Sequence, residues 1–236
     1  MTQYGRWGNP KFANTSFKSL LASPRTKNQE QITKERMAHY QQDKEIAQEF
    51  RIQLTILFSL VAIFWIIELV DLFILSSYSL DRFGIIPRNP VGLRGIILAP
   101  FLHGNIPHLI ANTIPFVSLG WLVMLQETSD FWRVTGVTAL VGGLGVWLIG
   151  QPGSIHIGAS ILIFGYLGFL LFRGVFQRNA PSIALSIVVG IFYGSLIWGV
   201  LPLQAGISWE GHLFGFIGGV IAARWIGKSR RSQFKN

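Results

Sequence analysis

Polar side chains that can act in catalysis recur in the apolar part of the chain. They are an asparagine, a serine and four histidines: Asn112, Ser160, His103, His108, His156 and His212. A serine nucleophile requires a neighbouring base, because the base accepts the hydroxyl proton. These residue types therefore indicate serine-nucleophile chemistry if the fold brings Ser160 and a histidine together.

His108 and Asn112 are four residues apart, so they lie on one face if the segment is helical. Both side chains can donate hydrogen bonds into the protein interior. Pro107 beside them is well suited to the start of a helix. Hydrogen bonding between membrane helices is an alternative role for the pair.

Ser160 and His212 each lie among small residues. Ser160 follows Gly158 and Ala159, whereas the glycines near His212 are spaced by four residues: Gly211, Gly215 and Gly219. Such a stripe lets two helices approach closely, and if the partner is the helix of Ser160, the imidazole reaches the hydroxyl. Packing alone is an alternative role for this serine, since the G-x-S-x-G elbow with its strand-turn-helix context is missing.

The elements that must position these residues are transmembrane helices. No Asp, Glu, Lys or Arg occurs between Arg94 and Glu127, Arg133 and Arg173, or Arg178 and Glu210. Soluble helices need a polar face, and a membrane span needs about 20 mainly apolar residues. The sequence predicts an all-α polytopic bundle with spans near 53–77, 106–125, 132–150, 157–173, 181–201 and 211–227.

The composition excludes several other classes of protein. Half of the 236 residues are hydrophobic, which excludes an intrinsically disordered chain. The chain has no cysteine, which excludes disulfides, Cys-ligated zinc and a cysteine nucleophile. Its net charge of +9 comes mainly from the two tails without a nucleic-acid-binding motif, so we expect no nucleic-acid partner. We expect no metal and no organic cofactor.

Six spans place both termini on one side of the membrane. The residues up to Arg51 and from Arg224 onward include fourteen of the twenty Lys and Arg residues, so the positive-inside rule predicts that both termini are cytoplasmic. The start of the chain has no apolar run of the signal-peptide type. We expect an N-terminal tail at 1–51 with a helix at 28–51, a six-helix domain at 52–227 and a basic C-terminal tail at 228–236.

The motifs follow one another in a fixed order along the predicted helices. The order is His103-x4-His108-x3-Asn112, then Gly158-x-Ser160, then Gly211-His212-x2-Gly215-x3-Gly219. The long loop at 78–105 precedes them and contains Phe83-Gly-Ile-Ile-Pro-Arg88, Gly92-Leu-Arg94 and Phe101-Leu-His103. In combination, over about 53–227, these features resemble the rhomboid family of intramembrane serine proteases, whose bacterial members have a similar loop.

The resemblance implies a mechanism and a role for each residue. Ser160 would attack the scissile carbonyl and His212 would be the general base, a dyad that forms an acyl-enzyme. His108, Asn112 and the backbone N–H of Ser160 would form the oxyanion hole. Supporting roles would fall to His103, Phe164, Gly158, Gly211 and Gly215.

One residue departs from the family pattern, because many rhomboids have glycine directly after the serine and this chain has Ile161. We expect this β-branched residue to narrow the site or to alter the backbone at the oxyanion hole. Three further polar residues receive no catalytic role. Glu68 is expected to pair with a first-loop arginine such as Arg94, Asp71 to lie near the outer end of its span, and His156 to be a polar loop residue.

The leading hypothesis is a hydrolase of peptide bonds in or near the transmembrane segment of another membrane protein. The resemblance implies a site near the non-cytoplasmic side, which substrate enters past the fifth helix and the 202–210 loop. A catalytically silent relative that binds membrane proteins is the alternative, and a transporter, which would require discontinuous helices or a repeat, is a third. We expect a bacterial cell membrane, with an organelle or photosynthetic membrane as alternatives; substrate identity and oligomeric state stay open.

Overall fold

The computed structural model describes residues 24–75, 79–203 and 206–233, and it divides into the units Met1–Arg51 and Ile52–Asn236. The first unit contributes the beginning of helix α2 (Pro24–Val70). The predicted helix at 28–51 is therefore confirmed, although it begins at Pro24 rather than at residue 28. The side chains of residues 28–51 are exposed, as expected for a solvated helix. The rest of the predicted tail, 1–23, lies outside the described residues.

The second unit is a helical bundle preceded by a chain of short helical turns. After α2 come η2 (Asp71–Leu75), η3 (Leu80–Phe83), η4 (Pro90–Arg94), α3 (Gly95–Leu98) and η5 (Ala99–Phe101). The long helices are α4 (Ile106–Met124), α5 (Thr128–Ile149), α6 (Ser160–Gln177), α7 (Ala180–Tyr193) with η6 (Gly194–Val200), and α8 (Trp209–Gln233). Among the described residues the β-structure is one isolated bridge, so the all-α prediction is confirmed.

Five helical segments of the described residues are long and apolar enough to cross a membrane. They are Asn28–Leu75, Ile106–Met124, Thr128–Ile149, Ser160–Gln177 and Ala180–Val200. The sixth predicted span corresponds to α8, in which Glu210, His212 and Arg224 lower the hydropathy. The count of six spans therefore stays a prediction, whereas the positions of the other five helices agree with the sequence pattern.

The fourth predicted span begins later than expected, whereas the fifth agrees with the apolar segment Ala180–Val200 but contains two kinds of helix. The fourth span does not begin near 157, because Gly158 has a φ of +110° and a right-handed helix can start only after it. The fifth span is not one α-helix, since α7 ends at Tyr193 and a 3-10 helix continues to Val200. The turn at 194–200 presents backbone carbonyls that a regular α-helix would use internally.

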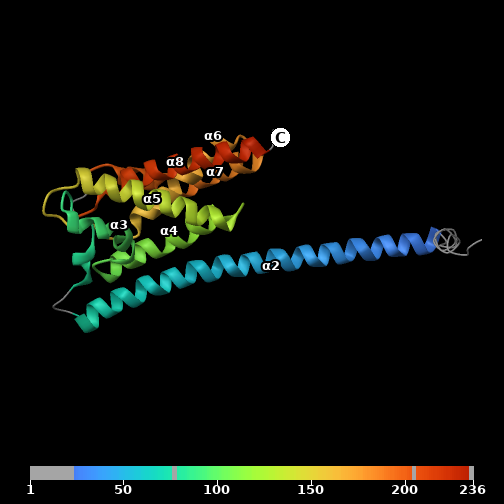
Figure 1. The fold of residues 1–236 in the computed structure, drawn as a ribbon, viewed down its shortest axis with the longest axis horizontal. Helices are drawn as coiled ribbons and strands as arrows, with labels where there is room; N and C mark the ends of the chain where they lie inside the picture. Colours follow the sequence, from blue (N-terminus) through green and yellow to red (C-terminus); the bar gives the residue numbers. More distant parts are fainter. Residues whose placement is uncertain (1–23, 76–78, 204–205, 234–236) are drawn as a thin grey trace, which may run out of the picture. The chain divides into compact units, whose positions relative to one another are not determined.

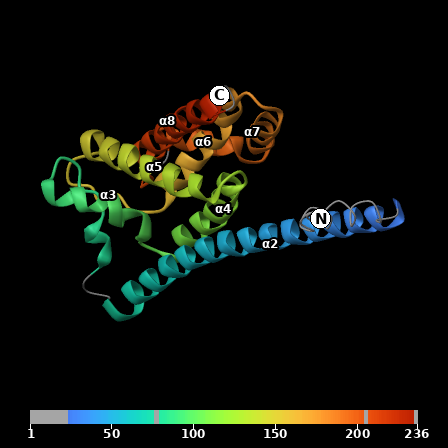
Figure 2. The same ribbon diagram turned by 45° about the vertical axis from the view of Figure 1, so that its right-hand side comes forward.

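Helix α6 is the central element of the bundle. In its most apolar stretch 72% of the residues are buried, against 6% for the segment that contains α7. Helix α8 lies alongside α6 in both views (Figures 1 and 2). Helices α4, α5 and α7 also pack against α6. The helix that begins with Ser160 is therefore surrounded by protein, whereas α7 is peripheral.

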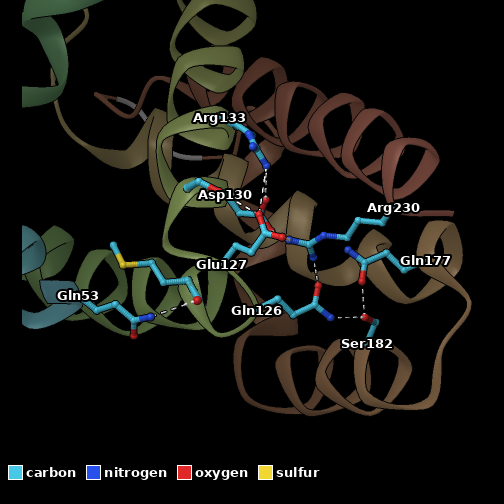
Figure 3. A network of polar contacts seen from close by, with 10 residues as sticks. Gln53, Gln126, Glu127, Asp130, Arg133, Gln177, Ser182 and Arg230 are labelled. Carbon is cyan, nitrogen blue, oxygen red and sulfur yellow. Dashed lines mark hydrogen bonds and ion pairs between the residues drawn. The ribbon is translucent and has the colours of Figure 1, made fainter. Parts of the chain in front are cut away.

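A polar network joins the ends of several helices of the bundle (Figure 3). The fully buried Asp130 on α5 accepts a hydrogen bond from Arg230 of α8 at 2.7 Å and one from Arg133 at 3.3 Å. Arg230 also donates to Gln126. Gln126 in turn donates to Ser182 at the start of α7, at 3.0 Å. Because removing one partner of a buried ion pair is costly, this network fixes the register of α8 against α5.

Candidate functional site

The long first loop holds the segment that leads into Ser160. Ile85 and His156 exchange two backbone hydrogen bonds of 2.9 Å each. Two residues later the N–H of Gly158 donates to the carbonyl of Ala99 at 2.8 Å. These three bonds attach the 151–159 loop to the first loop, so the first loop determines where α6 begins.

Gly158 cannot be replaced by a residue with a side chain without strain. Its φ of +110° is rarely adopted by L-residues. A Cβ at this position would lie 2.8 Å from Nε2 of His108 and 3.4 Å from Nδ2 of Asn112. The absence of a side chain therefore lets two nitrogen atoms of α4 approach the backbone that immediately precedes Ser160.

His108 and Asn112 are oriented by the start of α4. The side chain of Asn105 caps the helix by accepting from the N–H of His108 at 2.8 Å. Nδ1 of His108 lies 2.6 Å from the carbonyl oxygen of His103. A carbonyl only accepts, so Nδ1–H is the donor, and Nε2 faces Gly158. Asn112 is 6% exposed and its Nδ2 is buried without a hydrogen-bond partner. An unpaired donor therefore lies beside the segment of the nucleophile.

His212 lies in the first turn of α8 with a defined ring orientation. Its ring stacks on Phe164 of α6, with centroids 4.0 Å apart and planes at 6°. Nδ1 lies 2.8 Å from the carbonyl oxygen of Gly199, so Nδ1–H donates to it. In the neutral ring this leaves the lone pair on Nε2, which is the atom that a general base uses.

The glycines of α8 bring its backbone against α6. A Cβ at Gly215 would overlap the carbonyl oxygen of Ile161, and one at Gly219 would overlap that of Gly165. The spacing predicts a close contact with some helix, and in the structure that helix is α6, which begins with Ser160. Among the described residues no hydrogen bond joins Ser160 and His212. What brings their elements together is this backbone contact and the stacking on Phe164, one turn after Ser160.

His103 supports the arrangement of His108 and Asn112. It is fully buried, and its Nε2 accepts from the N–H of Ala159 at 3.5 Å. Burial, and then the neighbouring His108, lowers the pKa of His103 to about 4. A neutral ring agrees with an accepting Nε2. The buried carboxylate of Glu68 lies beside the backbone of the same turn, at His103 and Gly104.

The predicted pairing of Glu68 with Arg94 is wrong. Among the described residues no ion pair joins the two; Arg94 lies over the ring of Phe83 at 4.4 Å and donates to the carbonyl of Arg82. Asp71, predicted near the outer end of its span, accepts from the backbone N–H of Leu80 at 2.7 Å. Asp71 therefore holds loop backbone, and Glu68 lies beside loop backbone rather than in an ion pair with Arg94.

Ile161, the residue that was expected to narrow the site, is buried between α5 and α8. Its side chain is 4% exposed and belongs to an apolar cluster with Ile85 and Val146. A Cβ at Gly142 of α5 would lie 2.6 Å from it, and one at Gly211 of α8 would lie 3.0 Å from it. The missing side chains of these two glycines accommodate Ile161 between α5 and α8.

Two contributors to the site were not predicted from the sequence. The carbonyl of Gly199 orients His212, and no pattern indicates this because it depends on the 3-10 turn. Ser208 holds the start of α8, since its Oγ accepts from the N–H of Gly211 at 3.3 Å. A serine before a helical segment is a recognised N-cap signal, so the sequence could have identified Ser208.

Comparisons with known proteins agree with this geometry. A family model for the Rhomboid domain matches residues 91–229. An uncharacterized protein of Mycobacterium tuberculosis is 44% identical over 185 residues, which cover 75% of this chain and 76% of that protein. The rhomboid protease GluP of Bacillus subtilis is 29% identical over 146 residues, covering 58% of this chain and 27% of GluP.

A second protein of Bacillus subtilis, the putative rhomboid protease YdcA, is 25% identical over 134 residues, covering 53% of this chain and 63% of YdcA. The apolar helices and these matches together indicate a multi-pass membrane protein. The domain match covers more than half of the residues, including both Ser160 and His212. The chain belongs to the rhomboid family.

Proposed function

We propose that this chain is an intramembrane serine endopeptidase that cleaves other membrane proteins in or near a transmembrane segment. Membership of the rhomboid family implies intramembrane proteolysis, and the arrangement of the site supports a Ser-His dyad. The observation that carries the proposal is the buried, unpaired Nδ2 of Asn112 beside Gly158. A buried donor without a partner costs free energy, and an oxyanion formed at Ser160 would supply the partner.

In the proposed reaction Ser160 Oγ bonds to the scissile carbonyl carbon while its proton passes to Nε2 of His212. The carbonyl oxygen becomes an oxyanion that accepts from Nδ2 of Asn112 and the N–H of Ser160. The proton on His212 then passes to the leaving amine as the C–N bond breaks. Water, deprotonated by His212, attacks the acyl-enzyme, and the proton returns to Ser160 as the acid leaves.

His108 has a conditional role in this scheme. Its Nδ1–H is committed to the carbonyl of His103, so Nε2 can donate to an oxyanion only when the ring is protonated. Asn112 donates in either case. We therefore assign the larger and less pH-dependent share of oxyanion stabilisation to Asn112, and His103 supports the pair by fixing the turn before α4.

Substrate is proposed to enter from the lipid past α7. Only Ser182 and Val189 of that helix are buried, so few contacts hold it against the bundle. The two termini are proposed to be cytoplasmic, with Ser160 near the opposite face, where water can reach it. Both features follow the family and the positive-inside rule.

Cleavage of a model transmembrane substrate in liposomes tests the proposal. The wild-type protein is expected to release two fragments, and Ser160→Ala is expected to release none, because the variant lacks the hydroxyl that would form the acyl-enzyme. Absence of cleavage in the wild type would support the silent membrane-protein binder instead. Cleavage by Ser160→Ala at the wild-type rate would exclude the dyad.

The Asn112→Ala variant is expected to lose about 10²–10³-fold in kcat, the usual loss for one oxyanion donor. KM is expected to change little, because the bond forms only in the transition state. The matched control on the same helix is Ile114→Ala, since Ile114 is 69% exposed. Initial rates over a range of substrate concentrations in liposomes separate the two constants; an unchanged kcat for Asn112→Ala contradicts the oxyanion role.

A further inference from the structure

His156 links the two catalytic segments although it lies in neither. Its ring Nδ1 is 2.6 Å from Oγ of Ser208, and its ring Nε2 is 2.7 Å from Oγ of Ser154. Its backbone is bridged to Ile85 in the first loop. The side chain is 8% exposed. A loop histidine with both ring nitrogens and both backbone groups bonded is a fixed part of the structure.

The direction of each hydrogen bond can be assigned from one carbonyl group. Oγ of Ser154 donates to the carbonyl of Gln151 at 2.6 Å, so it must accept from His156, whose Nε2 therefore carries the proton. Nδ1 of the neutral ring is then an acceptor, and Ser208 donates to it. The Oγ of Ser208 is left free to accept from the N–H of Gly211, as it does at 3.3 Å.

The hydrogen bonds therefore form a continuous series from α8 to the loop before Ser160, and every donor in it has an acceptor. It passes from the N–H of Gly211 through Ser208, His156 and Ser154 to the carbonyl of Gln151. Burial lowers the pKa of His156, which keeps the ring neutral, while the nearby Glu210 opposes this shift. Protonation would place a second hydrogen on Nδ1 and disturb this order.

Ser208 is the point at which His156 acts on the catalytic base. Besides accepting from Gly211, Ser208 accepts through its backbone carbonyl from the N–H of His212 at 3.2 Å. A displacement of Ser208 therefore moves the first turn of α8 and the imidazole attached to it. Misplacement of a catalytic group by about 1 Å can cost roughly 10²-fold in rate.

We propose that His156 is a positioning residue that, through its hydrogen bond with Ser208, fixes His212 relative to the segment of Ser160. The proposal rests on the proposed proteolytic function, because positioning of a general base has a kinetic meaning only there. His156 does not touch the reacting atoms. Its contribution is to connect the loop before α6 with the start of α8, two segments joined by no continuous helix.

Two substitutions of His156 separate its two hydrogen bonds. In His156→Asn the side-chain amide reaches the place of Nδ1 and can still accept from Ser208, but it is too short to reach Ser154. In His156→Gln the amide reaches the place of Nε2 and can still donate to Ser154, but it leaves the hydroxyl proton of Ser208 without an acceptor. Ser154→Ala and Ser208→Ala remove the same two bonds from the other side, and Ser208→Ala also removes the acceptor of the Gly211 N–H.

Cleavage kinetics in liposomes give the first readout. His156→Gln and Ser208→Ala are expected to lose roughly 10–10²-fold in kcat with little change in KM. His156→Asn and Ser154→Ala are expected to stay within about threefold of the wild type, since the bond to Ser208 persists. Equal activity of His156→Gln and wild type, or equal losses in all four variants, overturns the proposal.

Hydrogen exchange measured by mass spectrometry gives a second readout that needs no activity. Amides in 209–214 are expected to exchange faster in His156→Gln and Ser208→Ala than in the wild type, while α4 amides keep their rates. Faster exchange throughout the bundle indicates general destabilisation and contradicts a local role. If the wild type neither cleaves the model substrate nor reacts with a serine-directed fluorophosphonate, the proposed function fails. Unchanged hydrogen exchange in 209–214 contradicts the positioning role by itself.

Discussion

The His212→Ala variant is expected to fold normally and to lose about 10²–10⁴-fold in kcat, the usual contribution of general-base catalysis. Two contacts orient the imidazole. The ring of Phe164 stacks on it at 4.0 Å, and the carbonyl of Gly199 accepts its Nδ1–H at 2.8 Å. Together these contacts hold the ring in place and leave the lone pair of Nε2 available to accept a proton.

Kinetic constants for purified His212→Ala and wild type, with a thermal unfolding curve for each, measure this effect. His39→Ala is the matched control, because His39 is an exposed histidine of α2 in the first unit. It is expected to retain wild-type kcat. A His212→Ala protein that unfolds at the wild-type temperature and retains more than about a tenth of wild-type kcat contradicts the assignment of the base.

The Gly219→Ala variant is expected to destabilise the bundle by at least about 1–3 kcal/mol, the usual cost of overpacking. The added methyl group would overlap the backbone carbonyl oxygen of Gly165 on α6. The carbonyl group of a helix backbone cannot change rotamer as a flexible side chain can. We therefore expect α6 and α8 to separate. Because these helices carry Ser160 and His212, activity is expected to fall together with stability.

Gly136→Ala on α5 is the control for Gly219→Ala. An added Cβ at Gly136 meets no atom within 4 Å, so only the gain in helix propensity remains, about 0.5–1 kcal/mol in favour of folding. The two substitutions are chemically identical and are expected to shift the unfolding midpoint in opposite directions. Midpoints shifted alike would show that the small-residue contact between α6 and α8 does not determine stability.

Local patterns in the sequence were sufficient to predict most of the helices and a close-packing face on α8, but not which helix that face contacts. The uncharged stretches indicate the long helices because burial of charge in lipid is costly. The fourfold spacing of Gly211, Gly215 and Gly219 predicts a smooth helix face, and that face contacts α6. Helix α8 shows the limit of hydropathy, since polar residues such as Glu210 and His212 make it less apolar than the other long helices.

Features that depend on contacts distant in the sequence could not be predicted. The carbonyl of Gly199 is free to orient His212 because the chain forms a 3-10 turn there. The bond between His156 and Ser208 joins residues 52 positions apart. Glu68 was expected to pair with an arginine, but it lies beside loop backbone at His103 and Gly104 instead. In each case a polar group found a partner that no local pattern specifies.

The central claim is that Ser160 is an activated nucleophile, and covalent labelling tests it most directly. The purified wild-type protein, in detergent or liposomes, is treated with a serine-directed fluorophosphonate and digested for mass spectrometry. The structure predicts one modified residue, Ser160, with labelling abolished in Ser160→Ala and strongly slowed in His212→Ala. Labelling of other serines at comparable rates, or equal labelling of wild type and His212→Ala, would contradict the dyad.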